Sequence, residues 1–137
     1  MNILILMKLK ANAKWPTSII QNHMLNILDD NINYLPLEEI KYIALSLYNS
    51  TEKKDFEFYY IVAEVFAKIG LCDLAVEASI LSLNGDIERD YLYVKHAKIL
   101  QQCSSASTAL KFLSKLQGTK NETELVKNFT KRLKQVT

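Results

Sequence analysis

Glycine, proline, cysteine and histidine are all scarce in this sequence of 137 residues, which has three, two, two and two of them. The shortage of glycine and proline argues against a turn-rich β fold and favours long, uninterrupted helices. The cysteines and histidines lack metal-ligand spacing such as Cys-x-x-Cys, so we expect no zinc site. Nucleophile-elbow, phosphate-loop and His-Glu-x-x-His motifs are also missing. We therefore expect no catalysis, no metal and no cofactor.

An excess of charge of either sign is missing as well. The formal net charge is +2, from 17 basic and 15 acidic residues. A surface for nucleic acid or for an acidic membrane needs a basic excess, so we expect neither partner. Apolar residues make up 49% of the sequence, which is typical of a globular domain.

The sequence also predicts a cytoplasmic location. The apolar run near the N-terminus is too short to span a membrane, and Lys8 and Lys10 follow it, whereas a signal peptide has its positive charges first. We expect Cys72 and Cys103, which lie in different repeats, to be two separate thiols that act as small apolar residues. Unpaired thiols are typical of proteins in a reducing compartment.

What the sequence does contain is an internal repeat. Residues 59–83 have the spacing of two amphipathic helices joined at Gly70, and the pattern recurs 34 residues later. The matched pairs are Tyr59/Tyr93, Ala63/Ala97, Phe66/Leu100, Gly70/Ser104, Ala75/Ala109 and Ser79/Leu113. Alanine permits close approach of paired helices, and glycine adopts the left-handed conformation that ends a helix. A helix–turn–helix period of 34 residues is typical of tetratricopeptide repeats.

The predicted fold is all-α, an α-solenoid of three such hairpins followed by a C-terminal capping helix. We expect the hairpins at about 16–49, 56–84 and 89–118 and the cap at about 121–136, all in one domain of residues 15–137. Residues 1–14 form an N-terminal extension of uncertain structure. The first hairpin is degenerate, because Asp29 occupies the small-residue position and Pro36 the turn position.

A partner-binding groove is predicted on the first helices of the hairpins, which line the concave side of a repeat stack. One inner row is Asn26, Tyr60 and Val94, a second is Asp30, Glu64 and Lys98, and Lys68, Tyr91 and Gln101 lie near them. The tyrosines suit a groove that closes on a helix, or they pack between adjacent helices. Acidic residues in the second row would repel an acidic tail, so we expect an amphipathic helix as the ligand. His96 is predicted to be a core histidine and not a catalytic one.

The C-terminal third carries a further resemblance. Residues 107–116 (STALKFLSKL) and 125–133 (LVKNFTKRL) resemble the small chaperones of bacterial type III secretion, above all the needle-subunit chaperones. This resemblance implies a cytoplasmic protein that holds a secreted helical subunit monomeric in its concave groove. It also implies a small co-chaperone that contacts the first hairpin. Chaperones of the translocator proteins share the architecture and are the alternative, and a generic repeat scaffold or regulator is a third interpretation.

Overall fold

Seven helices make up the part of the chain that the computed structural model describes, which is residues 18–50, 53–84 and 89–136. They are α2 (Ser18–Asp30), α3 (Leu37–Tyr48), α4 (Phe56–Lys68), α5 (Cys72–Leu83), α6 (Asp90–Cys103), α7 (Ala106–Ser114) and α8 (Glu124–Gln135). These ranges contain no strand, so the prediction of an all-α fold is confirmed. The N-terminal extension of residues 1–14 lies outside the described ranges.

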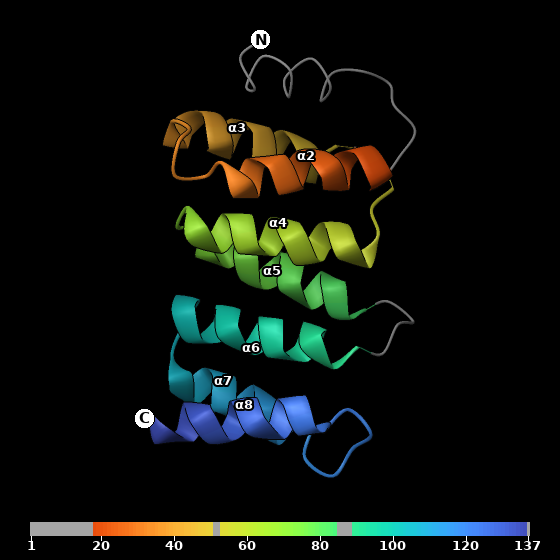
Figure 1. Ribbon diagram of the computed structural model, residues 1–137, viewed down its shortest axis with the longest axis vertical. Helices are drawn as coiled ribbons and strands as arrows, with labels where there is room; N and C mark the ends of the chain where they lie inside the picture. Colours follow the sequence, from red (N-terminus) through yellow and green to blue (C-terminus); the bar gives the residue numbers. More distant parts are fainter. Residues whose placement is uncertain (1–17, 51–52, 85–88, 137) are drawn as a thin grey trace.

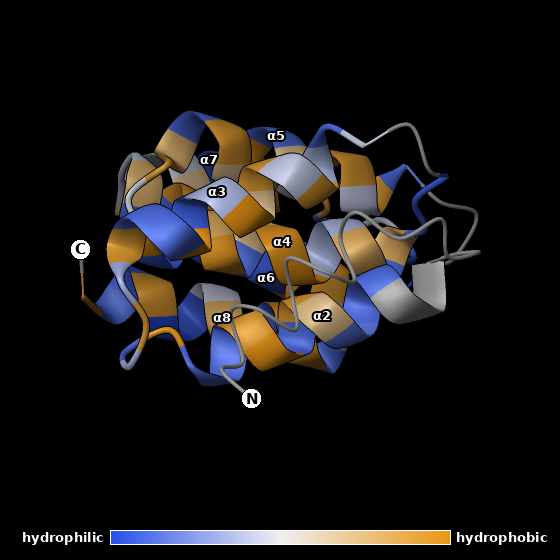
Figure 2. Cartoon of the chain, turned by 90° about the horizontal axis from the view of Figure 1, so that it is seen from above, coloured by the Kyte–Doolittle hydropathy of each residue, from blue (hydrophilic) through white to orange (hydrophobic). Residues whose placement is uncertain are grey.

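The helices follow one another in chain order along the long axis of the molecule, from α2 and α3 at one end to α7 and α8 at the other (Figure 1). Seen along that axis, α3, α5 and α7 lie on one side, α2 and α8 on the other, and α4 and α6 between them (Figure 2). Each even-numbered helix packs against the next one, as α2 does on α4, α4 on α6 and α6 on α8. We call their exposed surface the even-helix face; on it, α2 and α8 flank α4 and α6.

Local signals fix both ends of α4. The Asp55 side chain accepts a hydrogen bond from the backbone N–H of Phe58 at 2.8 Å, which caps the first turn. At the other end Gly70 has φ +84°, and the N–H of Leu71 donates to the carbonyl of Phe66 at 2.9 Å. This is the hydrogen-bond pattern of a glycine-terminated helix, so the predicted turn at Gly70 is confirmed.

The turn between α6 and α7 uses serine instead of glycine. Ser105 is the N-cap of α7, and its hydroxyl accepts from the backbone N–H of Thr108 at 3.1 Å.

At the start of α6, the carboxylate of Asp90 accepts from the hydroxyl of Thr123, the N-cap residue of α8, at 2.8 Å. This contact joins the beginnings of two helices that are far apart in the sequence.

The four alanines of the repeat are at the centre of the helix packing. Ala63, Ala75, Ala97 and Ala109 are fully buried, as predicted for close-approach positions. Around them lie two apolar clusters, one made mainly by α2–α5 and one by α6–α8. The paired helices of each hairpin therefore approach closely at these alanines, inside a tightly packed interior.

The two cysteines do not match the prediction. Cys72, the first residue of α5, and Cys103, the last of α6, form a disulfide with a Cα–Cα distance of 5.3 Å. Because α5 and α6 pack side by side, the bond joins residues from consecutive hairpins. The expectation of two separate thiols is therefore wrong. The expectation rested on the two cysteines lying in different repeats, but the packing of α5 on α6 brings them together.

Candidate functional site

A chain of ion pairs crosses the even-helix face from α2 to α6. The Lys68 ammonium on α4 lies 2.8 Å from the Asp29 carboxylate on α2 and 3.8 Å from Glu64 on its own helix. Glu64 in turn lies 2.7 Å from the Lys95 ammonium on α6. Helices α2, α4 and α6 are thus linked by alternating charges, and Asp29 and Glu64 are both paired with lysines.

The environment of these groups shifts their pKa values. Burial alone would raise the pKa of Glu64, but the hydrogen bond and charge of Lys95, together with Lys68 and more distant Lys98, lower it. The pKa of Lys68 is raised by its hydrogen bond with Asp29, which outweighs partial burial. Both groups are therefore held in their charged forms near neutral pH.

Two tyrosines pack against each other where α4 meets α6. The rings of Tyr60 and Tyr91 are perpendicular with centroids 5.5 Å apart, and both side chains are half-buried. The Lys95 ammonium lies 4.7 Å from the Tyr60 ring centre, and the Arg89 guanidinium lies 6.0 Å from that of Tyr91. Burial, and to a lesser degree Glu64, raises the pKa of Tyr60. The pair packs between adjacent helices, as one alternative predicted, and its exposed parts stay on the face.

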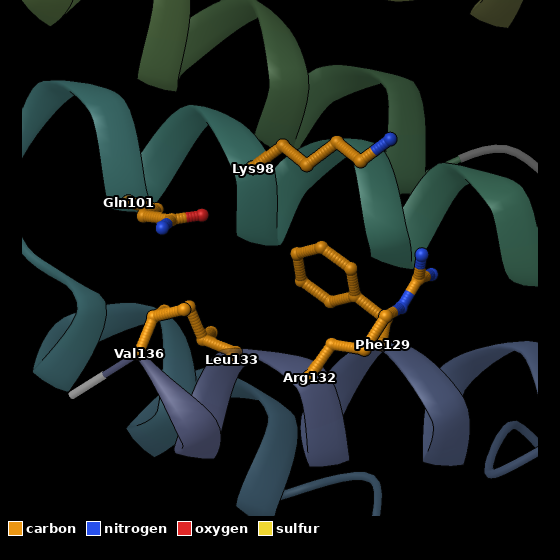
Figure 3. Close-up of a pocket in the computed structure, with 6 residues that line it drawn as sticks. All are labelled: Lys98, Gln101, Phe129, Arg132, Leu133 and Val136. Carbon is orange, nitrogen blue, oxygen red and sulfur yellow. The ribbon is translucent and has the colours of Figure 1, made fainter.

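A cleft of about 250 Å³ opens between α6 and α8 (Figure 3). Its lining consists of Lys98, Gln101, Phe129, Arg132, Leu133 and Val136. The Lys98 ammonium lies 5.9 Å from the ring centre of Phe129. In Figure 3 the charged ends of Lys98 and Arg132 extend toward the same end of the cleft. Among the described residues, Arg132 has no ion-pair or hydrogen-bond partner.

A second cleft, of about 160 Å³, lies between α4 and α6. Glu64, Lys68 and Lys95 line it together with Lys98, which also lines the first cleft. The Gln102 amide bridges its floor by donating to the carbonyl of Ala67 at 3.1 Å. Lys98 therefore stands between two neighbouring depressions on one surface.

The predicted groove residues are divided between this surface and other places. Those that line the clefts are Glu64, Lys68, Lys98 and Gln101. Asn26 and Asp30 are exposed on α2 and line neither cleft. Val94 is only 7% exposed and packs in the apolar cluster of α6–α8, so it does not lie on the open surface.

The inner rows predicted from the repeat period do not include Lys95, Phe129 and Arg132, because contacts between even-numbered helices do not follow that period. Three of these contacts, Tyr60–Tyr91, Glu64–Lys95 and Lys98–Phe129, have an offset of 31 residues instead of 34. The Asp29–Lys68 ion pair has an offset of 39. Three residues of α-helix amount to about one turn, or roughly 5 Å along the axis. Equivalent residues of successive hairpins are therefore displaced by about one turn in the first three contacts.

His96 lies away from this surface. Its side chain is 4% exposed, and its Nδ1 shares a hydrogen bond with the Ser79 hydroxyl. The centre of its ring lies 4.6 Å from the centre of the Phe112 ring. Burial lowers the pKa of His96 to about 4. The prediction of a packed, hydrogen-bonded core histidine is confirmed.

No family model, curated protein or solved structure matches this chain. Within the described ranges, no group of three or more histidine, cysteine or acidic residues is arranged to hold a metal ion. None of the described helices is both long and apolar enough to cross a bilayer. The open clefts, the tyrosine pair and the balanced ion pairs form a surface suited to noncovalent contact.

Proposed function

We propose that this chain is a protein-binding scaffold of the tetratricopeptide-repeat type, whose even-helix face holds a helical segment of a partner. The observation that carries the proposal is the pair of adjoining clefts on α4, α6 and α8, in which apolar side chains (Phe129, Leu133 and Val136 in one, Ala67 and Ile99 in the other) lie among charged ones. Inter-helical clefts of this kind take the apolar stripe of an amphipathic helix. The 34-residue period and the buried alanines support the repeat architecture.

The more specific proposal is a chaperone of a type III secretion system that keeps the needle subunit monomeric. It is supported by the resemblance of residues 107–116 and 125–133. A chaperone of translocator proteins is the alternative, and a generic repeat scaffold or regulator is the third candidate. In each case the proposed role is binding and not catalysis.

The first hairpin offers a separate surface for the proposed co-chaperone. Large apolar side chains are exposed there, with Leu37 at 54%, Tyr42 at 59% and Tyr34 at 83%. Exposed apolar groups gathered at one end of a molecule favour a protein contact. This end is opposite α8, so a co-chaperone and the main partner would bind at different places.

A cytoplasmic location belongs to the same proposal, and the disulfide makes it testable. Disulfides persist in oxidising compartments, whereas in most cytosols cysteines are kept as thiols. The proposal therefore requires Cys72 and Cys103 to be thiols in the living cell. Rapid alkylation of intact cells followed by mass spectrometry would measure this, and a fully oxidised pair in the cell would contradict the location.

The partner can be identified by purifying the tagged chain from its native cells and sequencing whatever co-purifies. We expect one small helical protein at equal stoichiometry. Tyr60→Glu places a charge on the face, and we expect it to abolish that association, with circular dichroism to confirm that the variant is folded. Ile80→Glu puts the same charge on an exposed apolar residue of α5, on the other side of the molecule, and should leave the association intact. Equal binding by wild type and Tyr60→Glu would refute the proposed face.

A further inference from the structure

The two halves of the even-helix face differ in their charge balance. Between α2 and α6, Asp29 and Glu64 are paired with lysines. Around the α6–α8 cleft no acidic side chain belongs to the lining, whereas Lys98 and Arg132 both do. The acidic residues of these two helices, Asp90 and Glu124, lie at the helix starts, and each already has a partner.

The apolar part of this cleft has helical spacing. Phe129 and Leu133 of α8 and Val136, the residue that caps its C-terminal end, follow one another at four and three residues, with Arg132 beside them. This stripe covers about two turns, or roughly 10 Å. Phe129 and Leu133 are nearly buried, but Val136 is 73% exposed at the end of the stripe. A helix laid along α8 would cover Val136 and keep its own apolar residues in register with the stripe.

We propose that the α6–α8 cleft docks an acidic amphipathic helix of the partner protein. Its apolar side chains cover Val136 and the exposed edge of Phe129, and a glutamate or aspartate carboxylate lies between Lys98 and Arg132. The inference rests on the proposed protein-binding function and adds the charge of the ligand. It reverses the expectation that acidic groups are repelled, because the acidic residues that led to that expectation lie on α2 and α4.

Charge complementarity selects this occupant over two others. The apolar stretch of residues 1–10 of this chain carries Lys8 and Lys10 as its charged side chains, so it would bring positive charge to a positive cleft. The α8 helix of a second copy would do the same, because its exposed side is rich in lysine. A carboxylate next to an arginine with no partner among the described residues forms a charge-assisted hydrogen bond that neither alternative offers.

The test uses the full chain and three matched peptides. Each is a capped amphipathic helix of about fifteen residues with leucines at helical spacing. The residues beside the leucines are glutamate in the first peptide, glutamine in the second and lysine in the third. Binding is followed through the backbone amide resonances of the isotope-labelled protein. We expect the glutamate peptide to bind most tightly and to shift resonances of α6 and α8 around the cleft.

Two variants of α8 provide the matched control. Arg132→Gln removes a charge that lines the cleft, and Lys131→Gln removes a charge from an exposed neighbour outside it. We expect Arg132→Gln to weaken the glutamate peptide by about five- to tenfold. Lys131→Gln should change its affinity by less than about twofold, because an exposed charge outside the contact contributes little. Lys98→Gln should resemble Arg132→Gln.

The outcomes separate this inference from the proposed function. Equal binding of the glutamate and glutamine peptides, or equal effects of the two α8 variants, would overturn the carboxylate contact and leave helix docking in place. Shifts confined to the α4–α6 cleft would overturn the location. If none of the peptides binds but the cellular partner does, the inferred ligand is wrong and the scaffold proposal survives. If no peptide binds and no cellular partner co-purifies, both the inferred ligand and the scaffold proposal are rejected. A dimer of the free chain that forms through this cleft would also overturn the inference, because a second copy would then be the occupant. Sedimentation would detect the dimer, and the backbone amide resonances would locate its interface.

Discussion

The hairpins α4–α5 and α6–α7 are two versions of one 34-residue pattern, and they agree where helices touch most closely. Ala63 and Ala97 are equivalent and both are fully buried, and the same holds for Ala75 and Ala109. At such positions a larger side chain would push the helix axes apart. The agreement shows which positions determine how the helices pack.

The two hairpins differ at equivalent positions that carry a polar or charged side chain. His96 occupies the position equivalent to Val62, so a fully apolar site in one hairpin is a hydrogen-bonded imidazole in the other. Glu64 is equivalent to Lys98, so an ion-paired carboxylate in one is a cation beside an open cleft in the other. A common packing pattern therefore carries side chains of opposite charge at equivalent positions.

The largest expected effect comes from the link between the two hairpins. Cys72→Ala gives α5 the residue that α7 has at the equivalent position, Ala106, and removes the disulfide. A crosslink over a sequence separation of 31 stabilises by limiting the unfolded chain, so we expect the free energy of unfolding to fall by about 3–4 kcal/mol. Urea denaturation under oxidising conditions measures this. Reductant should destabilise the wild type similarly and leave Cys72→Ala unchanged; a wild type unaffected by reductant would contradict the bond.

The shared alanines allow a test of what the hairpins have in common. We expect Ala63→Leu and Ala97→Leu each to lower the free energy of unfolding by about 1–3 kcal/mol, because the larger side chain overpacks a fully buried site. Ala106→Leu is a useful comparison, since its side chain is only partly buried at the start of α7. Thermal denaturation would compare the three. Equal stability of all three variants would mean that the close-approach positions are misassigned.

His96→Val makes the second hairpin resemble the first. The pKa of His96 is about 4 in the folded protein and near 6.5 in an unfolded chain, so the unfolded state binds more protons between these values. The wild type should therefore be fully stabilised above pH 6.5 and should lose stability as the pH falls to 4. After allowance for solvent screening, we expect the wild type to lose about 2 kcal/mol more than His96→Val over that interval.

Chemical denaturation at a series of pH values, with His96→Val subtracted from the wild type, isolates this contribution from those of the carboxylates. Parallel profiles for the wild type and His96→Val would show that burial of the imidazole does not govern acid stability.

The sequence predicted the fold where the reasons are local. The glycine at the end of α4, the serine before α7 and the small residues at the helix crossings each act within one hairpin, so spacing alone located them. Burial of His96 was also predictable, because the matching position of the preceding hairpin is a valine. These features need no knowledge of how one hairpin lies on the next.

The candidate site depends on that missing knowledge. A repeat period identifies equivalent residues, but contacts form between residues displaced by about one turn, so the period led to Lys98 as the neighbour of Glu64 when Lys95 is the direct partner. Phe129 and Arg132 lie on α8, outside the repeat, and no internal comparison could place them opposite Lys98. The disulfide was missed for a similar reason, since it joins the ends of two helices that become neighbours only in the stack.

The smallest expected effect concerns the turns that distinguish the hairpins. Gly70 has φ +84°, and a Cβ atom added there would meet no atom within 4 Å, so Gly70→Ala carries a purely conformational cost. We expect a loss of about 1–2 kcal/mol, because a side chain disfavours the left-handed region. Ser104, at the equivalent position, has a negative φ of −132°, so Ser104→Ala meets no left-handed penalty and should cost about 0.5 kcal/mol, through loss of the hydroxyl contact with Thr108. Urea midpoints of the two variants measure the difference. Equal midpoints would mean that the α4–α5 turn tolerates a side chain as well as the α6–α7 turn does, and the glycine would then not be what ends α4.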